Sequence, residues 1–201
     1  DYTYMNEQWI QAPKIDGNQE LAAQFHVSPM AMRLIRSRAG ESEAEVRAYL
    51  YGTLEDLADA RLMKGMTEAV ELLRQKIRVG ATIRIIGDYD IDGVNATHIL
   101  VTGLRRVGAQ VDTVIPDRLK DGYGINEHLI EQAKEAGIDT IVTCDNGIAA
   151  AKEIAYAKEL GMTVIVTDHH EIPYREAEDS TRTTILPPAD VIVNPKQADC
   201  P

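Results

Sequence analysis

The sequence predicts an α/β protein: an open parallel sheet of about five strands with helices on both faces, preceded by a small helical N-terminal segment. Two observations predict this fold. Short runs rich in β-branched residues recur in the later part of the chain, and their starts are separated by 29, 29, 23 and 28 residues, the length of a strand–helix repeat. Between these runs, apolar residues recur at three- and four-residue steps, as they do on one face of a helix.

Residues 1–65 form the expected N-terminal segment. Apolar residues recur here with helical spacing, at Leu21, Phe25, Met30, Leu34, Ile35, Val46 and Leu50. Ser28 is a suitable N-cap, and Pro29 suits the first turn of a helix. We therefore expect a small helical bundle. A helix-turn-helix reader of nucleic acid is a weaker alternative, supported only by one basic helix with Arg33, Arg36 and Arg38.

Residues 66–201 form the second expected domain and carry the strand–helix repeats. The expected strands cover 82–86, 111–115, 140–143, 163–166 and 191–193. The expected helices cover 67–78, 94–107, 126–136 and 148–160. Asn126 is a good N-cap, and Gly137 and Gly161 stand where a left-handed C-terminal cap is needed. No helical pattern follows the last strand, so we expect this domain to be truncated at its C-terminal end.

Composition and charge narrow the class of protein. An apolar content of 44% excludes a disordered chain. The formal charge of -11 gives no general attraction to a nucleic-acid backbone, so a phosphate-bearing ligand must be held by a local site or by metal ions. Cys144 and Cys200 form no Cys-x-x-Cys spacing, which excludes a disulfide framework and a cysteine-rich zinc site. No apolar run nears the roughly 18 residues that span a bilayer, and the first residues do not resemble a signal peptide. We expect a cytoplasmic protein that does not act at a membrane.

Carboxylates follow three of the expected strands at the point where each strand ends. The three segments are Asp88-Tyr-Asp-Ile-Asp-Gly93, Asp145-Asn-Gly147 and Asp168-His-His170. Ligands of open parallel sheets collect at the carboxyl ends of the strands, because loops and helix N-termini converge there. We therefore expect all three segments to face the same edge of the sheet.

This concentration of aspartates predicts a metal site. Five aspartates on one edge repel one another, and burying them without partners is unfavourable unless cations or protons neutralise them. The same loops hold no comparable group of lysines or arginines. Divalent ions, more naturally two than one, are the expected neutralisers. Carboxylates mixed with imidazoles suit Mn²⁺ well and Mg²⁺ less well, and they leave Zn²⁺ open. Two ions about 3.5 to 4 Å apart are the usual arrangement for hydrolysing a phosphoester.

Each segment also has a structural explanation when taken alone. Asp-x-Asp-x-Asp-Gly could be a turn, a helix cap or a calcium loop, although Ile99 stands where an EF-hand needs its closing glutamate. Asp145-Asn-Gly could simply cap the next helix. Asp168-His-His directly after an apolar strand has little structural reason to exist, and the combination is stronger than any part. We expect His98 to pack along a helix and Cys144 to be a buried thiol.

The three segments, in this order on a parallel sheet, resemble the first three motifs of the DHH phosphoesterases. Within that superfamily the chain is most similar to the RecJ-type single-stranded-DNA-specific exonucleases. Ile115–Ile125 resembles their Pro-x-Arg-x-x-(Glu/Asp)-Gly-Tyr-Gly segment, and Asn194-Pro-Lys resembles the segment after their fifth strand. The parts around Leu54–Leu57 and Met63–Met66 resemble the lead-in to their catalytic domain. The likeness covers nearly the whole chain.

The resemblance implies roles for individual residues. The metal-binding positions would be Asp88, Asp90, Asp92, Asp145 and His169, with Asp145 as the bridging carboxylate. Asp168 would orient these ligands from behind, and His170 would contact the scissile phosphate. Contacts to the nucleic-acid backbone or a base would come from Arg118, Lys120 and Tyr123. The family's fourth motif and its C-terminal substrate-gripping domain have no counterpart before residue 201.

The implied function is a metal-dependent phosphodiesterase: a 5′ to 3′ exonuclease for single-stranded DNA in repair and recombination, with Asp90, Asp145, His169 and His170 as catalytic residues. The resemblance implies Mn²⁺ or Mg²⁺ as cofactor and a single-strand-binding protein or a helicase as partner. Without the fourth motif, we expect these residues alone to have little nuclease activity. Two alternatives stay open. One is a DHH enzyme for short oligonucleotides, cyclic dinucleotides or pyrophosphate; the other is a scaffold or binding protein that keeps the fold without turnover.

Overall fold

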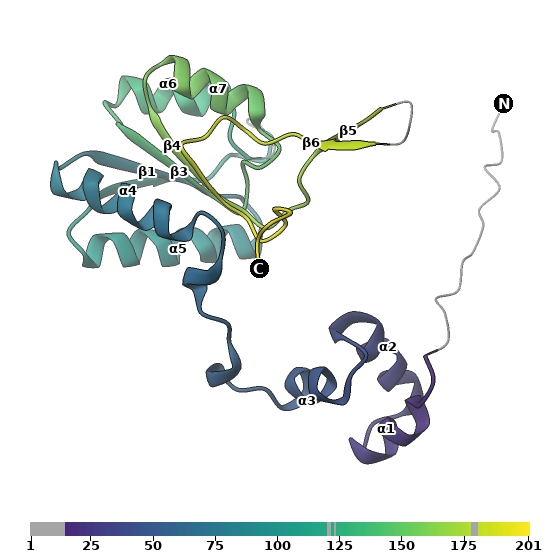
Figure 1. The fold of residues 1–201 in the computed structure, drawn as a ribbon. Coiled ribbons are helices and arrows are strands. Elements are labelled where there is room, and N and C mark those ends of the chain that lie inside the picture. Colours follow the sequence, from purple (N-terminus) through teal and green to yellow (C-terminus); the bar gives the residue numbers. More distant parts are fainter. Residues whose placement is uncertain (1–14, 120–121, 123, 178–180) are drawn as a thin grey trace. The chain divides into compact units, whose positions relative to one another are not determined.

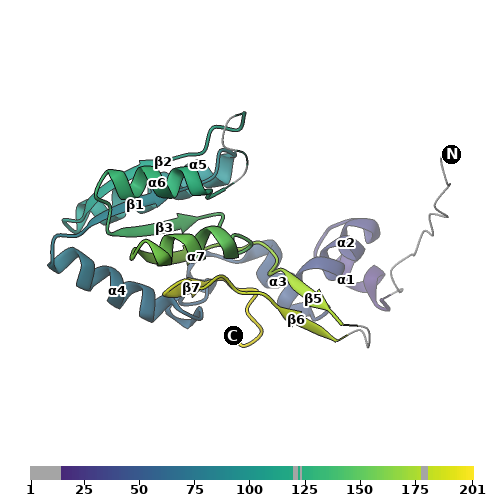
Figure 2. The ribbon, with the colours of Figure 1, turned by 90° about the horizontal axis from the view of Figure 1, so that it is seen from above.

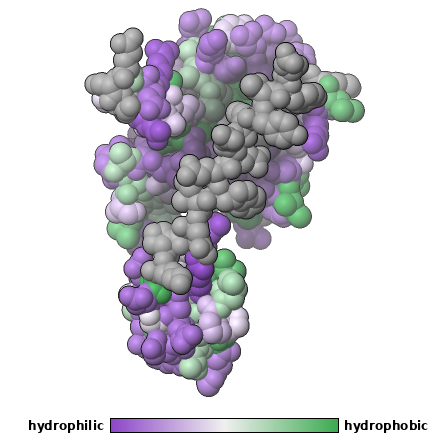
Figure 3. All heavy atoms as spheres, turned by 90° about the vertical axis from the view of Figure 1, so that its right-hand side faces the viewer, coloured by the Kyte–Doolittle hydropathy of each residue, from purple (hydrophilic) through white to green (hydrophobic). Residues whose placement is uncertain are grey.

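The computed structural model describes residues 15–119, 122, 124–177 and 181–201. The chain divides into two compact units, Asp1–Ala58 and Asp59–Pro201. On the face shown in Figure 3, most of the coloured surface is hydrophilic, in line with the formal charge of -11. Among the described residues, no helix has both the length and the apolar content that crossing a membrane requires.

The first unit is helical, as the apolar spacing predicts. It contains α1 (Asn18–Gln24), α2 (Pro29–Ala39), α3 (Glu43–Tyr51) and the 3-10 turn η1 (Leu54–Asp56). The Ser28 hydroxyl caps α2 by accepting from the N–H of Ala31 at 3.1 Å, and Phe25, Met32 and Val46 form the centre of a small core. Arg36 is buried and donates to Asp16 O, Asn18 Oδ1 and Glu41 O at 2.6 to 3.0 Å. One of the three arginines of the helix-turn-helix alternative therefore serves internal packing.

The second unit is built on a five-stranded parallel sheet (Figure 1). The strands are β1 (Thr82–Ile86), β2 (Gln110–Val114), β3 (Thr140–Cys144), β4 (Thr163–Thr167) and β7 (Val191–Val193), in the order β2-β1-β3-β4-β7. Every residue of β3, at the centre, is buried, which explains its unbroken β-branched run. The predicted fold class, an open parallel α/β sheet after an N-terminal helical segment, is confirmed.

Helices cover both faces of this sheet (Figures 1 and 2). They are α4 (Met66–Arg78), α5 (Ile91–Arg106), α6 (Glu127–Glu135) and α7 (Ala151–Glu159). Ile83, Val142 and Ile165 pack with α4 and α5, whereas Ile141 and Val164 pack with α6 and α7. Alternate residues of each strand thus enter opposite cores, as the period of two along a strand requires.

The order of the strands predicts a place for a ligand at the carboxyl ends of β1 and β3. From β1 the chain crosses by α5 to β2 on one side, and from β3 it crosses by α7 to β4 on the other side. Neighbouring strands whose connections diverge in this way leave an opening at their carboxyl ends. The Asp88 and Asp145 segments follow these two strands, so both flank the opening.

Some local predictions were wrong. Helix α5 begins at Ile91, not 94, because Asp90 caps it from within the acidic segment, and α7 begins at Ala151, not 148. A short antiparallel hairpin, β5 (Tyr174–Glu176) and β6 (Arg182–Thr184), was not predicted. Another turn, η2 (Ala60–Leu62), precedes α4. His98 is exposed on α5 and does not pack, whereas Cys144 is a buried thiol with 2% exposure, as expected.

Candidate metal centre

The loop after β1 supplies carboxylates in three different environments. Asp88 is only 1% exposed; its Oδ1 accepts from the N–H of Tyr89 at 2.8 Å. Asp90 is the N-cap of α5 and accepts from the N–H of Gly93 at 3.0 Å. Asp92 lies exposed in the first turn of that helix. A Cβ at Gly93 would lie 2.7 Å from the Asp88 Cβ, so glycine is needed for the helix to start this close to the buried carboxylate.

The loop after β3 holds its aspartate in an unusual backbone conformation. Asp145 has φ +61, in the left-handed region that few residues other than glycine, asparagine and aspartate adopt. The next side chain fixes the loop: Asn146 Nδ2 donates to Ile86 O at 3.1 Å and to Cys144 O at 3.0 Å. This amide ties the end of β3 to the end of β1. Asn146 was not singled out from the sequence, although its place directly after the aspartate was a signal.

The loop after β4 is organised around Asp168. This buried carboxylate accepts from the backbone N–H groups of Ile148 at 2.9 Å, His169 at 2.7 Å and His170 at 3.1 Å, and from His170 Nδ1 at 2.7 Å. It therefore joins the loop after β4 to the loop after β3 and fixes the orientation of the His170 ring. His169 points back to the centre, with Nε2 2.8 Å from Asp145 Oδ1 and 3.8 Å from Asp92 Oδ2.

The structure brings most of the predicted ligands into two groups that could each hold a metal ion, but Asp92 belongs to neither group. One is Asp88, Asp90 and Asp145; the other is Asp145, His169 and His170. Within each group, one potential ligand atom from every residue lies within 4.8 Å of the others. Asp145 belongs to both groups, which is the arrangement that two ions sharing one carboxylate would need.

The electrostatics of the centre follow from burial and from the crowding of like charges. Burial, reinforced by neighbouring aspartates, raises the pKa of Asp88 and of Asp145. The N–H of Gly93 lowers the pKa of Asp90 by stabilising its charged form. Burial alone would lower the pKa of His170, but the hydrogen bond and charge of Asp168 outweigh it and raise that pKa.

The donor set fits a divalent cation. Asp88 Oδ2 is buried and accepts no hydrogen bond within the described part of the chain. A buried carboxylate oxygen without a donor is costly, whereas a metal ion would satisfy it. Oxygen ligands together with the imidazole of His169 suit Mn²⁺, whereas Mg²⁺ would bind through the carboxylate oxygens.

The residues expected to contact nucleic acid are only partly described. The guanidinium of Arg118 lies 5.4 Å from the centre of the Tyr89 ring, which places it beside the acidic loop after β1. Lys120 and Tyr123 lie outside the described residues.

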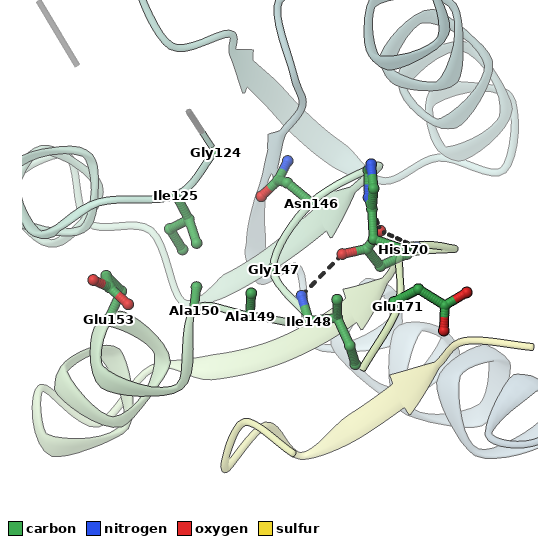
Figure 4. A pocket seen from close by; sticks show the side chains of 11 residues that line it. Gly124, Ile125, Asn146, Gly147, Ile148, Ala149, Ala150, Glu153, His170 and Glu171 are labelled. Atoms are coloured by element: carbon green, nitrogen blue, oxygen red, sulfur yellow. Dashed lines mark hydrogen bonds and ion pairs between the residues drawn. The ribbon is translucent and has the colours of Figure 1, made fainter. Parts of the chain in front are cut away.

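Two cavities border the centre. The first, of about 520 Å³, we call the Ala149 pocket; its walls include Ile125, Ile148, Ala149, Ala150, Glu153 and His170 (Figure 4). The second, of about 610 Å³, we call the apolar cavity, and it lies between α4, α5 and the sheet. Its walls include Met66, Leu73, Leu100 and Val142, and it reaches Asp92, Asp145 and His169.

Comparison with known proteins gives consistent matches. The DHH family, N-terminal domain, matches residues 82–201. The single-stranded-DNA-specific exonuclease RecJ of Bacillus subtilis is 42% identical over 191 residues, which are 95% of this chain but 23% of that protein. The same exonuclease of Escherichia coli is 35% identical over 93% of this chain and 30% of its own length. This chain thus spans about a quarter of the curated relatives it matches.

Two solved structures resemble the chain. The crystal structure of an exonuclease RecJ bound to manganese is 37% identical with a TM-score of 0.60, and the match covers 71% of this chain and 34% of that one. RecJ from Thermus thermophilus in complex with Mn²⁺ is 31% identical with a TM-score of 0.59, and the match covers 95% of this chain and 25% of that one.

Proposed function

Because the chain belongs to the DHH family, we propose that it is the N-terminal part of a metal-dependent phosphodiesterase, a RecJ-type exonuclease that degrades single-stranded DNA from its 5′ end. The observation that carries this proposal is the position of Asp145, which belongs to both potential metal-binding groups at the opening between β1 and β3. The relatives named for this activity, two of them with bound manganese, support the substrate class and the cofactor.

The proposed ligands are Asp88, Asp90, Asp92, Asp145 and His169, for Mn²⁺ or Mg²⁺. Two such ions would supply an activated water and would stabilise the charge that develops on the phosphate. Asp145 would bridge the two positions. Asp168 is a positioning residue, because all of its described contacts go to the loops and to the His170 ring. Its role is to hold the two histidines in place before substrate arrives.

His170 would contact the scissile phosphate. Its raised pKa favours the protonated imidazolium, which can donate a hydrogen bond to a phosphate oxygen. Attack of water on phosphorus breaks the bond to the 3′ oxygen of the leaving nucleotide; the attacking water releases a proton to solvent, and the 3′ oxygen takes one up from solvent. Arg118, Lys120 and Tyr123 are proposed to hold the strand on the approach to the centre.

The domain assignment is part of the proposal. Residues 1–65 would be the helical lead-in, and 66–201 a DHH-type domain truncated at its C-terminal end. The remaining metal ligand and the substrate-gripping domain would lie in the rest of the protein. A cytoplasmic location and a partner such as a single-strand-binding protein or a helicase are proposed on the family resemblance alone.

The test is digestion of 5′- and 3′-labelled single strands by the full-length protein with and without Mn²⁺. We expect Mn²⁺-dependent release from the 5′ end, lost in Asp145→Ala and kept in Glu135→Gln, which changes an exposed carboxyl at the end of α6. These 201 residues alone should show little activity. Digestion by the short chain at the full-length rate would contradict the truncation.

A substrate panel separates the proposal from its competitors. Short oligonucleotides, cyclic dinucleotides and pyrophosphate should be poorer substrates than long single strands. A preference for any of them would assign the same chemistry to a different substrate. No hydrolysis of any substrate by the full-length protein, together with no Mn²⁺ binding, would favour a non-catalytic scaffold.

A further inference from the structure

We propose that the Ala149 pocket binds the base of the nucleotide that adjoins the scissile phosphate. This inference rests on the proposed function and adds to it a place for one nucleobase, next to the metal centre. The pocket is about 520 Å³, and His170 and Asp168 form part of its wall.

The position of the pocket fits one nucleotide. Figure 4 shows His170 at one end of the pocket, Ile125, Ala150 and Glu153 around the other, and Ala149 between the two ends. If His170 contacts a phosphate oxygen, the sugar attached to that phosphate lies at the pocket mouth, and its base can enter. The pocket lies on the side of the sheet covered by α6 and α7, and it meets the centre at Asp168 and His170, so the two are neighbouring parts of one binding surface.

The walls of the pocket suit an uncharged, flat group. The side chains of Ile125, Ile148, Ala149 and Ala150 are apolar, and two consecutive alanines keep the space open. The faces of a nucleobase are poorly hydrated, so contact with apolar side chains removes them from water favourably. A Cβ at Gly124 would lie 3.3 Å from the Asn146 Cβ, and the backbone there has φ +70, so glycine also keeps this wall thin.

The charge of the pocket argues against a phosphate as its occupant. Among the described residues that line it, Glu153, Asp168 and Glu171 carry carboxylates, and no lysine or arginine is present. Glu171 is paired with Lys196, which lies outside the lining. His170 is the one described side chain of the lining that favours a phosphate, at the end next to the centre. A phosphate placed deeper, near Glu153, would meet like charge, whereas a base with amino or imino hydrogens could donate to the Glu153 carboxylate.

The experiment combines a filled pocket with a substrate that lacks the base. In the full-length protein, Ala149→Leu enlarges an exposed wall residue, so it should not disturb the core. Ala136→Leu makes the same change at an exposed position at the end of α6 and is the matched control. The substrates are a labelled single strand and copies with one abasic tetrahydrofuran residue at the first or the second position from the 5′ end. Initial rates of the first cleavage give kcat/KM.

We expect the wild-type protein to lose about tenfold in kcat/KM when the abasic residue occupies one of these two positions, and little at the other. Ala149→Leu should lose a similar factor on the intact strand and nothing further on that abasic strand, because the lost contact is the same one. Ala136→Leu should behave as wild type on every strand. Melting curves of the variants check that both are folded.

Two results would overturn the inference. One is an Ala149→Leu defect that multiplies with the abasic defect, since independent losses would mean different contacts. The other is an equal wild-type rate on intact and abasic strands, a result that does not depend on any variant being folded. Hydrolysis of bis(p-nitrophenyl) phosphate, which has no base, identifies the source of a failure. If the wild-type protein with Mn²⁺ cleaves neither this ester nor any strand, the proposed function falls, and this inference falls with it.

Discussion

Asp145 is the residue on which the centre depends most, because its backbone, burial and position serve three different needs. Its backbone lies in the left-handed region, its burial raises the pKa of its carboxyl group, and its carboxylate belongs to both potential metal-binding groups. Such a residue is unfavourable for the metal-free fold and useful only when a cation is bound.

We therefore expect Asp145→Asn to separate stability from function. Asparagine tolerates the left-handed conformation and carries no charge, so the free energy of unfolding of the metal-free chain should stay equal or rise. The affinity for Mn²⁺ should fall at least about tenfold, because the substitution removes the carboxylate that we propose two ions share. Urea unfolding in a chelator and calorimetric titration with Mn²⁺ measure the two effects. An unchanged Mn²⁺ affinity would exclude Asp145 as a ligand, and Glu135→Gln is the control.

Asp168 should control the protonation of His170. Asp168→Asn keeps the shape of the side chain but removes the charge that opposes the effect of burial, so the pKa of His170 should fall. NMR titration of the histidine Cε1–H signals measures the change. A rise in the His170 pKa would contradict the role given to Asp168.

Single residues differ in how far the sequence alone could predict them. The aspartates and histidines at the strand ends were identified, because their types are unusual directly after apolar strands. The roles of Asn146 and Tyr89 were not identified. The hydrogen bonds of the Asn146 amide to two strand ends, and the position of Arg118 over the Tyr89 ring, depend on how distant segments pack. His98 was misjudged because a lone histidine on a helix shows no orientation in the sequence.

Among the elements, the buried parallel strands were predicted best. Their β-branched runs reflect burial on both faces, a strong and local signal. The hairpin of β5 and β6 was missed because its residues are exposed and show no alternation of apolar and polar side chains. The start of α7 was placed too early because Gly147, with φ +106, and the residues after it form a loop before the helix. The strand order could not be predicted from any single segment, because it depends on which distant strands pair with one another.

Glycine positions give a test at the level of elements. Gly65, just before α4, has φ +81, and a Cβ there would overlap the carbonyl oxygen of Ile192 in β7. Gly65→Ala should therefore destabilise the chain by about 2 kcal/mol or more, through backbone strain and a clash between α4 and the edge strand. Unfolding in urea measures this.

Gly103 is the matched control. It lies exposed inside α5, and a Cβ there would meet nothing within 4 Å. Gly103→Ala should stabilise the chain by about 0.5 to 1 kcal/mol, because alanine restricts the unfolded chain and favours the helix. Equal effects of the two substitutions would contradict the close contact described at Gly65.

For the whole second unit, the contribution of the buried aspartates to stability should fall as pH rises without metal, and the contribution of bound Mn²⁺ should grow as pH rises. Burial raises the pKa of Asp88 and Asp145 above the ordinary value of 3.8. Between pH 3.8 and these raised pKa values, the folded chain keeps protons that the unfolded chain has released. Their contribution to stability is present below 3.8 and is lost as pH rises through the folded pKa values. Mn²⁺ competes with these protons, so its stabilising effect should grow with pH, to about 2.7 kcal/mol at a hundred times Kd.

The comparison of wild type with Asp88→Asn isolates this effect from other titrating groups. In a chelator, the variant should gain stability relative to wild type as pH rises from about 4 to 8. With saturating Mn²⁺ the difference should change sign, since the variant lacks one of the proposed ligands. Urea unfolding across this pH range provides the measurement. If the difference in stability between wild type and variant does not vary with pH, burial does not raise the pKa of Asp88.

The apolar cavity between α4, α5 and the sheet has a consequence for chemical inhibition. It is lined by side chains such as Met66, Leu73 and Leu100, and it opens onto Asp145 and His169. A small compound with a chelating hydroxamate head and a short aliphatic tail could therefore use the two properties together, its head at the proposed cation positions and its tail among these side chains. Because a chelating head would bind many metal sites alike, selectivity for this site would come from the tail.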